Sequence, residues 1–209
     1  YLRQEDLAFI PVPIERKPIS RRYRGIKVST MPPPSAGDTV LLVLMMLSNL
    51  KKSFLKTRSP QSYHFVSEIF RKALLYRTQR KFNPRTYHQI DTKTHLSRNF
   101  AKTLTQSIRD SIDPTLPLKE SPDIEDTTHL SVMDKDGNAI GITQSIELVY
   151  GSKAAADGLG FLYNNYMSAF EFENPSHPYY LRPNSIPWTS VSPSIIFYNH
   201  EPWIVIGSP

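Results

Sequence analysis

The amino-acid sequence predicts a mixed α/β (α+β) fold in which helices come first and strands follow. Apolar residues recur at helical spacing in two long segments before residue 113. After residue 126 the pattern changes to alternation of apolar and polar residues, which is typical of half-buried strands. A hydrophobic fraction of 39% in 209 residues suffices for a folded core. We therefore expect one interdependent fold organised around a single sheet.

The first fifty residues are predicted to pass from irregular chain to a strand and then to a buried helix. Residues 1–24 carry scattered prolines and charges, and 25–30 alternate as a strand. The three prolines at 32–34 stop this strand, because proline cannot lie within a central strand. The apolar segment 38–50 predicts a buried helix, since a membrane span needs about 20 residues.

Two amphipathic helices are predicted next. Ser59-Pro60 is a typical helix start, and apolar residues then repeat at helical spacing to about residue 80. The second helix spans about 93–112 and is stopped by Pro114. Both apolar stripes are interpreted as core faces.

The last third of the chain is predicted to be strands. A polar, proline-punctuated linker covers 114–126, and strands are expected at 129–134 and 139–145. The residues between them, 135–138, contain Asp-Gly and Gly-Asn pairs that suit a tight hairpin, and their spacing does not match a calcium loop. Further strand candidates are 160–163, 194–198 and 203–206.

Charge and residue counts exclude several chemistries. The chain has a net charge of +6, six histidines and no cysteine. Without cysteine there is no disulfide, thiolate nucleophile or cysteine-ligated metal. The histidines show no metal-ligand spacing, so we predict no metal or other cofactor. No aromatic ladder or recognised nucleic-acid motif accompanies the basic cluster between residues 16 and 24, so a solvated basic face is expected.

The segment that begins Thr127-Thr128-His129 carries the strongest functional signal. Two threonines that open a strand need no function by themselves. The sequence from Thr127 to Gly151, however, resembles the start of the small subunit of γ-glutamyltransferases, a family of N-terminal-nucleophile hydrolases. Residues 160–167 are similar to the family's Gly-Ile-Leu-Leu-Asn-Asn-x-Met segment, and residues 187–193 are similar to its Pro-Leu-Ser-Ser-Met-Ser-Pro segment. The segments 23–25, 31–35 and 68–73 resemble the end of the family's large subunit.

This resemblance implies a partial αββα four-layer sandwich. Residues 1–126 would be the C-terminal part of a large-subunit-like region, and 127–209 the N-terminal part of a small-subunit-like region. We expect the chain to be the middle of a longer protein and a weak catalyst alone, because the family's oxyanion glycines follow Gly207-Ser208-Pro209. Relatives favour a periplasmic or extracellular location and leave a cytoplasmic one open.

The resemblance also implies a reaction and its residues. Thr127 would cut the chain after Asp126 and then act as an N-terminal nucleophile on γ-glutamyl amides such as glutathione, with water or an amine as acceptor. A free α-amine titrates near about 7.7–8.0, so it can serve as the base for the hydroxyl. Ser145 stands where the family has a threonine beside the nucleophile. The implied substrate contacts are Glu147 for the α-amino group and Thr189 and Ser190 for the α-carboxylate.

Two positions depart from the family pattern. Ala169 stands where the family has an aspartate that binds the α-ammonium, and Tyr166 replaces a Gln or Glu beside it. A lost charge-assisted contact removes roughly 1.5–3 kcal/mol of recognition. The residues therefore leave open a related amide acylase, a poly-γ-glutamate-type hydrolase and a non-catalytic homologue.

Overall fold

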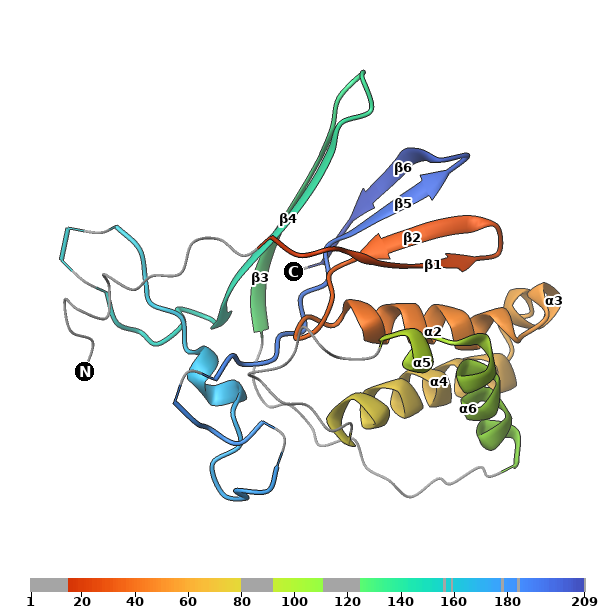
Figure 1. The fold of residues 1–209 in the computed structure, drawn as a ribbon, viewed down its shortest axis with the longest axis horizontal. Coiled ribbons are helices and arrows are strands. Elements are labelled where there is room, and N and C mark those ends of the chain that lie inside the picture. Colours follow the sequence, from red (N-terminus) through yellow and green to blue (C-terminus); the bar gives the residue numbers. More distant parts are fainter. Residues whose placement is uncertain are drawn as a thin grey trace.

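A computed structural model describes residues 15–79, 92–110, 125–155, 157–158, 160–177, 179–183 and 185–208. Figure 1 shows a layer of helices, a four-stranded sheet and a long separate hairpin. The helices are α2 (Gly37–Ser48), α3 (Lys52–Lys56), α4 (Pro60–Gln79), α5 (Thr92–His95), α6 (Arg98–Asp110) and the short 3-10 helix η2 (Tyr166–Ala169). The strands are β1 (Ile19–Tyr23), β2 (Ile26–Thr30), β3 (Glu125–Met133), β4 (Ala139–Leu148), β5 (Ser194–Tyr198) and β6 (Glu201–Ile206).

The four-stranded sheet combines strands from both ends of the chain. Its order is β1-β2-β5-β6, and every neighbouring pair is antiparallel. The β3–β4 hairpin forms a second, two-stranded sheet. The expectation of a single sheet was therefore wrong: β3 and β4 pair only with each other among the described strands, and the partners of β2 in β5 lie 164 to 170 residues later in the chain.

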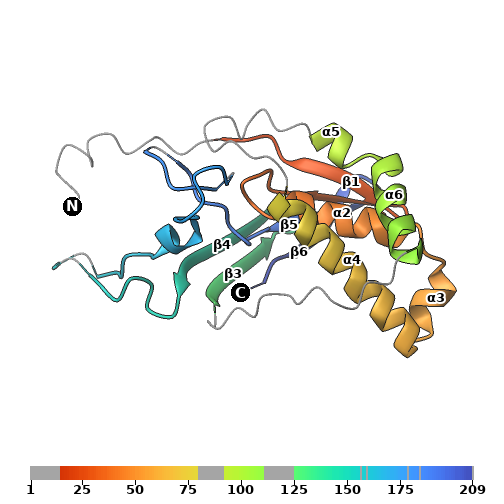
Figure 2. The same cartoon turned by 90° about the horizontal axis from the view of Figure 1, so that it is seen from below.

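The four-stranded sheet lies between the helices and the hairpin, as Figures 1 and 2 show. Val28 and its register partner Ile196 face the helices and belong to the core there. Val205 lies on the other face and approaches Gly141 of the hairpin, where a Cβ would be 3.0 Å from the valine side chain. The described residues thus form three successive layers of the predicted αββα arrangement.

The outer face of the hairpin is apolar and open. Its side chains alternate with those that face the four-stranded sheet, as the two-residue period of a strand requires. Four apolar residues on this face are each about half exposed: Leu130, Val132, Ile140 and Ile142. In the sandwich that the sequence predicts, a fourth layer of helices would cover this face.

The helical layer is built around α2. Its residues Leu41 and Met46 are fully buried, and Ile69 of α4 and Ala101 of α6 pack in the same core. Among the described residues, no helix is both long and apolar enough to cross a membrane. In the same ranges, no group of three or more histidine, aspartate or glutamate side chains is placed to hold a metal ion.

The predicted helix over 93–112 is two helices in the structure. Leu96, directly after α5, is buried in the core, and the Ser97 hydroxyl accepts a hydrogen bond from the Phe100 N–H at 3.1 Å. Serine in this position caps a new helix, so α6 starts at Arg98. Residues 111 and 112 lie outside the described ranges.

Other predicted boundaries differ from the structure in both halves. Strand β1 lies in the segment expected to be irregular or extended, and it pairs with β2 through the two-residue turn Arg24-Gly25, where both φ angles are positive. Helix α3 was not predicted. The strand expected at 160–163 is only an isolated bridge between Leu162 and Ala155. Strands β3 and β4 extend further toward Glu125 and Leu148 than the alternation suggested.

A buried ion pair on α4 allows a test by pH. Arg71 Nε and Nη2 donate to the two carboxylate oxygens of Glu68 at 2.9 and 2.6 Å, and both residues are buried. These hydrogen bonds hold the pKa of the Glu68 carboxyl below its ordinary value. The pair therefore stabilises the fold above the carboxyl's unfolded-state pKa, and this stabilisation is lost as the pH falls through the lower folded-state pKa.

We expect Glu68→Gln to lower the free energy of unfolding by roughly 1.5–3 kcal/mol at pH 7. The difference from the wild type should be smaller at pH 4 than at pH 7, because the carboxyl of the unfolded wild-type chain takes up a proton at a higher pH than the folded pair does. Urea unfolding at both pH values measures it. Glu173→Gln, at an exposed carboxylate, is the control and should change stability by less than about 0.5 kcal/mol. A Glu68→Gln effect that does not depend on pH would contradict the role of the charge.

Candidate active site

The hairpin places Thr127 directly opposite Ser145. The two residues are register partners in the antiparallel β3–β4 pair, and both are half-buried. Side chains of such partners project from the same face with Cβ atoms about 4.5–5.5 Å apart. His129 and Ser131 follow at two-residue intervals on this face, and Ser131 bonds to β6. Thr127 therefore belongs to the face of the hairpin that is directed toward the four-stranded sheet.

The strand pairing is interrupted beside the bond between Asp126 and Thr127. One residue, Asp126, separates Glu125 from Thr127 on β3, whereas two residues separate their partners on β4. The extra β4 residue makes a bulge at Ile146–Glu147. Glu147 has a φ of 77°, which a side chain other than glycine rarely adopts. Its N–H donates to the Ser145 hydroxyl at 2.9 Å, so the serine is held at the edge of the bulge.

Asn165 holds this bulge from outside the hairpin. Its backbone N–H donates to the Ile146 carbonyl at 3.2 Å, and its side-chain oxygen accepts the Leu148 N–H at 3.0 Å. The two bonds lie on either side of Glu147, so they stabilise its unusual backbone conformation. Sequence reasoning assigned no role to Asn165, although it lies in the segment that carries the resemblance.

Tyr166 and Thr189 form a second group of predicted site residues. The Tyr166 hydroxyl lies 3.3 Å from Thr189 Oγ1. The same Thr189 oxygen accepts the Val191 N–H at 3.3 Å. Ser190, the next residue, is exposed. Tyr166 follows Asn165 directly, so one peptide bond joins this group to the residue whose hydrogen bonds hold the bulge.

Arg77 of α4 fixes the Thr189 segment to the helical layer. Its Nη2 donates to the Thr189 carbonyl at 2.6 Å and to the Pro34 carbonyl at 3.2 Å. The guanidinium carbon lies 4.9 Å from the centre of the Trp188 ring, a cation–π contact. The Thr189 N–H also donates to the Pro34 carbonyl at 3.2 Å. Sequence reasoning assigned no role to Arg77.

A cavity of about 490 Å³ lies beside Ser145. Its volume is in the range of sites for small molecules. Besides Ser145 it is lined by Gln144, Ile146, Phe161, Leu162, Tyr163 and Asn164. Ser145, the register partner of Thr127, therefore borders a space large enough for an amino-acid-sized acyl group.

His129 connects the hairpin to the end of β6. Its ring nitrogens lie 2.7 Å from Thr143 Oγ1 and 2.8 Å from Ser131 Oγ. Ser131 donates onward to the Val205 carbonyl at 3.1 Å. The ring also lies against Gly207, where a Cβ would be 2.2 Å from Nδ1. The histidine thus has a structural role, two residues after the predicted nucleophile.

We expect Gly207→Ala to destabilise the protein by roughly 1–3 kcal/mol, because the new methyl group would overlap the His129 ring. Thermal unfolding measures this cost. The double variant His129→Ala/Gly207→Ala should recover part of the loss relative to the sum of the single variants, since residues in contact are not additive. Strict additivity would contradict the contact.

The structure thus joins the predicted residues in two groups. Thr127, Ser145 and Glu147 lie on the hairpin, and Tyr166, Thr189 and Ser190 lie in the segments tied to it through Asn165 and to the helices through Arg77. The side chain of Asp126 lies outside the described part of the structure.

A family model for gamma-glutamyltranspeptidase matches residues 1–209, the whole chain. The chain belongs to this family. The relatives include the glutathione hydrolase proenzyme of Escherichia coli K12, which is 31% identical over 227 aligned positions covering all of this chain. A glutathione hydrolase-like proenzyme of Bacillus subtilis, YwrD, is 30% identical over 91% of the chain. The chain spans 38% and 35% of the lengths of these two relatives.

Solved structures agree on the fold of this family member. The crystal structure of a cephalosporin acylase from Bacillus halodurans superposes with a TM-score of 0.80 and 24% sequence identity. The superposition covers 98% of this chain and 36% of the acylase. The predicted fold of the N-terminal-nucleophile hydrolase type is confirmed at this level.

Proposed function

We propose that the protein containing this chain transfers or hydrolyses γ-glutamyl groups with Thr127 as an N-terminal nucleophile, freed by cleavage of its own Asp126–Thr127 bond. The observation that carries the proposal is the register pair Thr127–Ser145, next to a bulge opposite Asp126. Family membership and the proenzyme names of the relatives support it.

The cleavage needs only groups of the chain and one water. Thr127 Oγ attacks the Asp126 carbonyl carbon, the Asp126–Thr127 C–N bond breaks, and the proton from the hydroxyl passes to the departing nitrogen. The resulting ester is hydrolysed by water, which leaves a carboxylate on Asp126 and a free α-amine on Thr127. A bulge opposite this bond supports the step, because it removes the regular strand pairing that would hold the peptide flat.

In turnover the same hydroxyl would attack the γ-glutamyl carbonyl, with the new α-amine as base. The donor's amine leaves with the proton, and the acyl group stays on Thr127 as an ester. Water then gives hydrolysis, and an amino acid or peptide amine gives transfer. Ser145 would support the threonine hydroxyl, and its position on the cavity wall is consistent with that role.

The substrate's charged groups would bind at the two groups of site residues. Glu147 would accept the α-ammonium, and the hydroxyls of Thr189 and Ser190 would donate to the α-carboxylate. The bulge places Glu147 at the joint between the hairpin and the Asn165–Tyr166 segment, which favours contact with a substrate that touches both groups.

An intact mass measurement of the natural protein tests the proposal. The expected result is two polypeptides, one of which starts at Thr127, together with release of the aniline from a γ-glutamyl anilide. A protein that remains uncut and has no activity on γ-glutamyl anilides would refute the proposal and favour a non-catalytic homologue.

A second candidate is an amide acylase with a different donor. The Tyr166 hydroxyl already bonds to Thr189, one of the two hydroxyls assigned to the α-carboxylate, and Ala169 supplies no carboxylate for the α-ammonium. Comparison of a γ-glutamyl anilide with the glutaryl anilide, which lacks the α-amino group, separates the two. Preference for γ-glutamyl supports the first proposal, and preference for glutaryl supports the acylase.

A further inference from the structure

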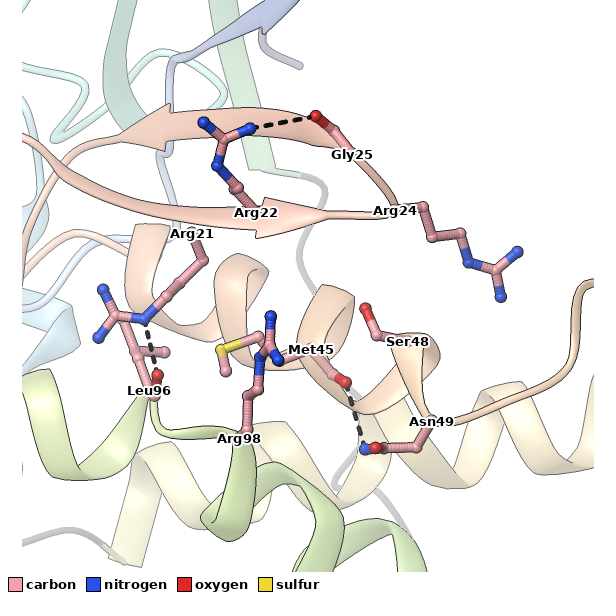
Figure 3. Close-up of a pocket in the computed structure, with 9 residues that line it drawn as sticks. All are labelled: Arg21, Arg22, Arg24, Gly25, Met45, Ser48, Asn49, Leu96 and Arg98. Carbon is pink, nitrogen blue, oxygen red and sulfur yellow. Dashed lines mark hydrogen bonds between the residues drawn. The ribbon is translucent and has the colours of Figure 1, made fainter.

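A second, larger cavity lies on the side of the four-stranded sheet that faces the helices. It has a volume of about 770 Å³ and opens between the β1–β2 turn, the C-terminal end of α2 and the N-terminal end of α6 (Figure 3). It is lined by Arg21, Arg22, Arg24, Gly25, Met45, Ser48, Asn49, Leu96 and Arg98. We call it the arginine pocket.

Three of the arginines border the space between the sheet and the helices. Arg21 shares a sheet face with its register partner Val28, which is buried against the helices. Arg98 rises from the first turn of α6, and Arg24 lies at the turn beside the end of α2 (Figure 3). Arg22 pairs with the exposed Lys27 on the opposite face and bonds to Gly25 at 3.4 Å, so it belongs to the rim.

Backbone carbonyls hold two of these guanidinium groups without cancelling their charge. Arg21 Nε donates to the Leu96 carbonyl at 2.6 Å, and Arg24 Nη2 donates to the Leu50 carbonyl at 3.0 Å. A carbonyl is a neutral dipole, so it orients the guanidinium and leaves the net charge. Among the lining residues there is no Asp or Glu.

Arg98 differs from the other two. It is exposed, and within the described part of the chain no hydrogen bond or ion pair holds its guanidinium. The fork of an arginine matches the oxygen atoms of phosphate and carboxylate groups. Three positive charges that share one pocket repel one another, and an anion between them would convert this repulsion into attraction.

We propose that the arginine pocket binds a small anion with at least two negatively charged phosphate or carboxylate groups. Arg21 and Arg24 are positioned in advance by their carbonyl partners, and Arg98 supplies the group that is free to turn toward the ligand. The cavity volume lies within the range of small-molecule sites.

This site is independent of the proposed nucleophile. The arginine pocket lies on the helix side of the four-stranded sheet, whereas Thr127 lies on the hairpin that packs on the other side. The binding of an anion here requires neither cleavage at Asp126 nor turnover, so it can be measured whether or not the proposed function holds.

Titration calorimetry of the natural protein with pyrophosphate and, separately, with citrate tests the proposal at low salt. Binding of pyrophosphate alone assigns phosphate, and binding of citrate alone assigns carboxylate. Arg98→Gln should weaken the binding about fivefold or more. Arg109→Gln is the matched control, because it removes the same charge at the other end of α6 and outside the pocket. Added sodium chloride should weaken the binding, since salt screens exposed charges.

Two results would overturn the proposal. One is the absence of heat or thermal stabilisation with either anion at millimolar concentration. The other is an equal loss of affinity in the Arg98→Gln and Arg109→Gln variants, which would indicate general attraction to a basic protein. Both results are readable without an activity assay.

Discussion

Replacement of Thr127 by alanine is expected to leave the chain uncut at Asp126–Thr127 and to lower γ-glutamyl transfer by more than about ten-thousandfold. The single hydroxyl would serve both reactions, so its loss removes both together. The position of Thr127 opposite Ser145 should tolerate alanine, because both residues are only half-buried. Intact mass and the rate of aniline release are the two readouts, with circular dichroism as the check on folding.

Thr127→Ser provides the matched control. Serine keeps the hydroxyl and loses one methyl group, so the chain should still be cut and should keep measurable activity. Cutting or turnover that survives in Thr127→Ala would rule out this residue as the nucleophile. A Thr127→Ala protein that is uncut but active would separate processing from catalysis and would require a different nucleophile for turnover.

Replacement of Asn165 by alanine is expected to slow both cleavage and turnover about a hundredfold, because a displacement of about 1 Å at a reacting centre has that effect. The alanine variant loses the oxygen that accepts the Leu148 N–H, and Glu147 then loses half of the support for its positive φ. The backbone bond from residue 165 to Ile146 remains, so the fold should persist.

Asn165→Asp distinguishes this positioning role from a general loss of stability. Aspartate retains an oxygen acceptor at the same place, so it should recover much of the rate that alanine loses. Kinetics with a γ-glutamyl anilide and the time course of chain cleavage supply the measurements. Equal rates in the alanine variant and the wild type would show that the bulge needs no support from Asn165.

Several elements were predictable because their signals are local. Ser59-Pro60 places a cap residue before a proline, and α4 begins at Pro60 as expected. The Asp-Gly and Gly-Asn pairs at 136–138 bring the chain back on itself between β3 and β4. The run Ser194–Tyr198 is β5 with the bounds that the sequence predicted. Each of these depends on residues within a few positions of one another.

Other features depend on residues far apart in the chain. Strand β1 contains Ser20, Arg21 and Arg22, three consecutive polar residues that interrupt the apolar–polar alternation typical of a strand. It is stabilised by pairing with β2. The segment at 160–163 is rich in β-forming residues, but within the described part of the chain its strand pairing is one bridge between Leu162 and Ala155. The hydrogen bonds of a strand are completed only by a neighbour, so the sequence of one segment cannot decide its state.

The sequence by itself determined the family and the order of the long helices before the β3–β4 hairpin, whereas the predicted order of helices before all strands was wrong, because β1 and β2 come first. The resemblance in the sequence also implied the candidate nucleophile Thr127 with Ser145 as its partner. These predictions follow from motifs and periodicity within short segments of the sequence. Only the tertiary structure decided that Asn165 supports the bulge at Glu147, that Arg77 anchors Thr189, and that three arginines share one pocket. The physical reason is that hydrogen bonds and charges act over a few ångströms in space, whatever the separation along the chain.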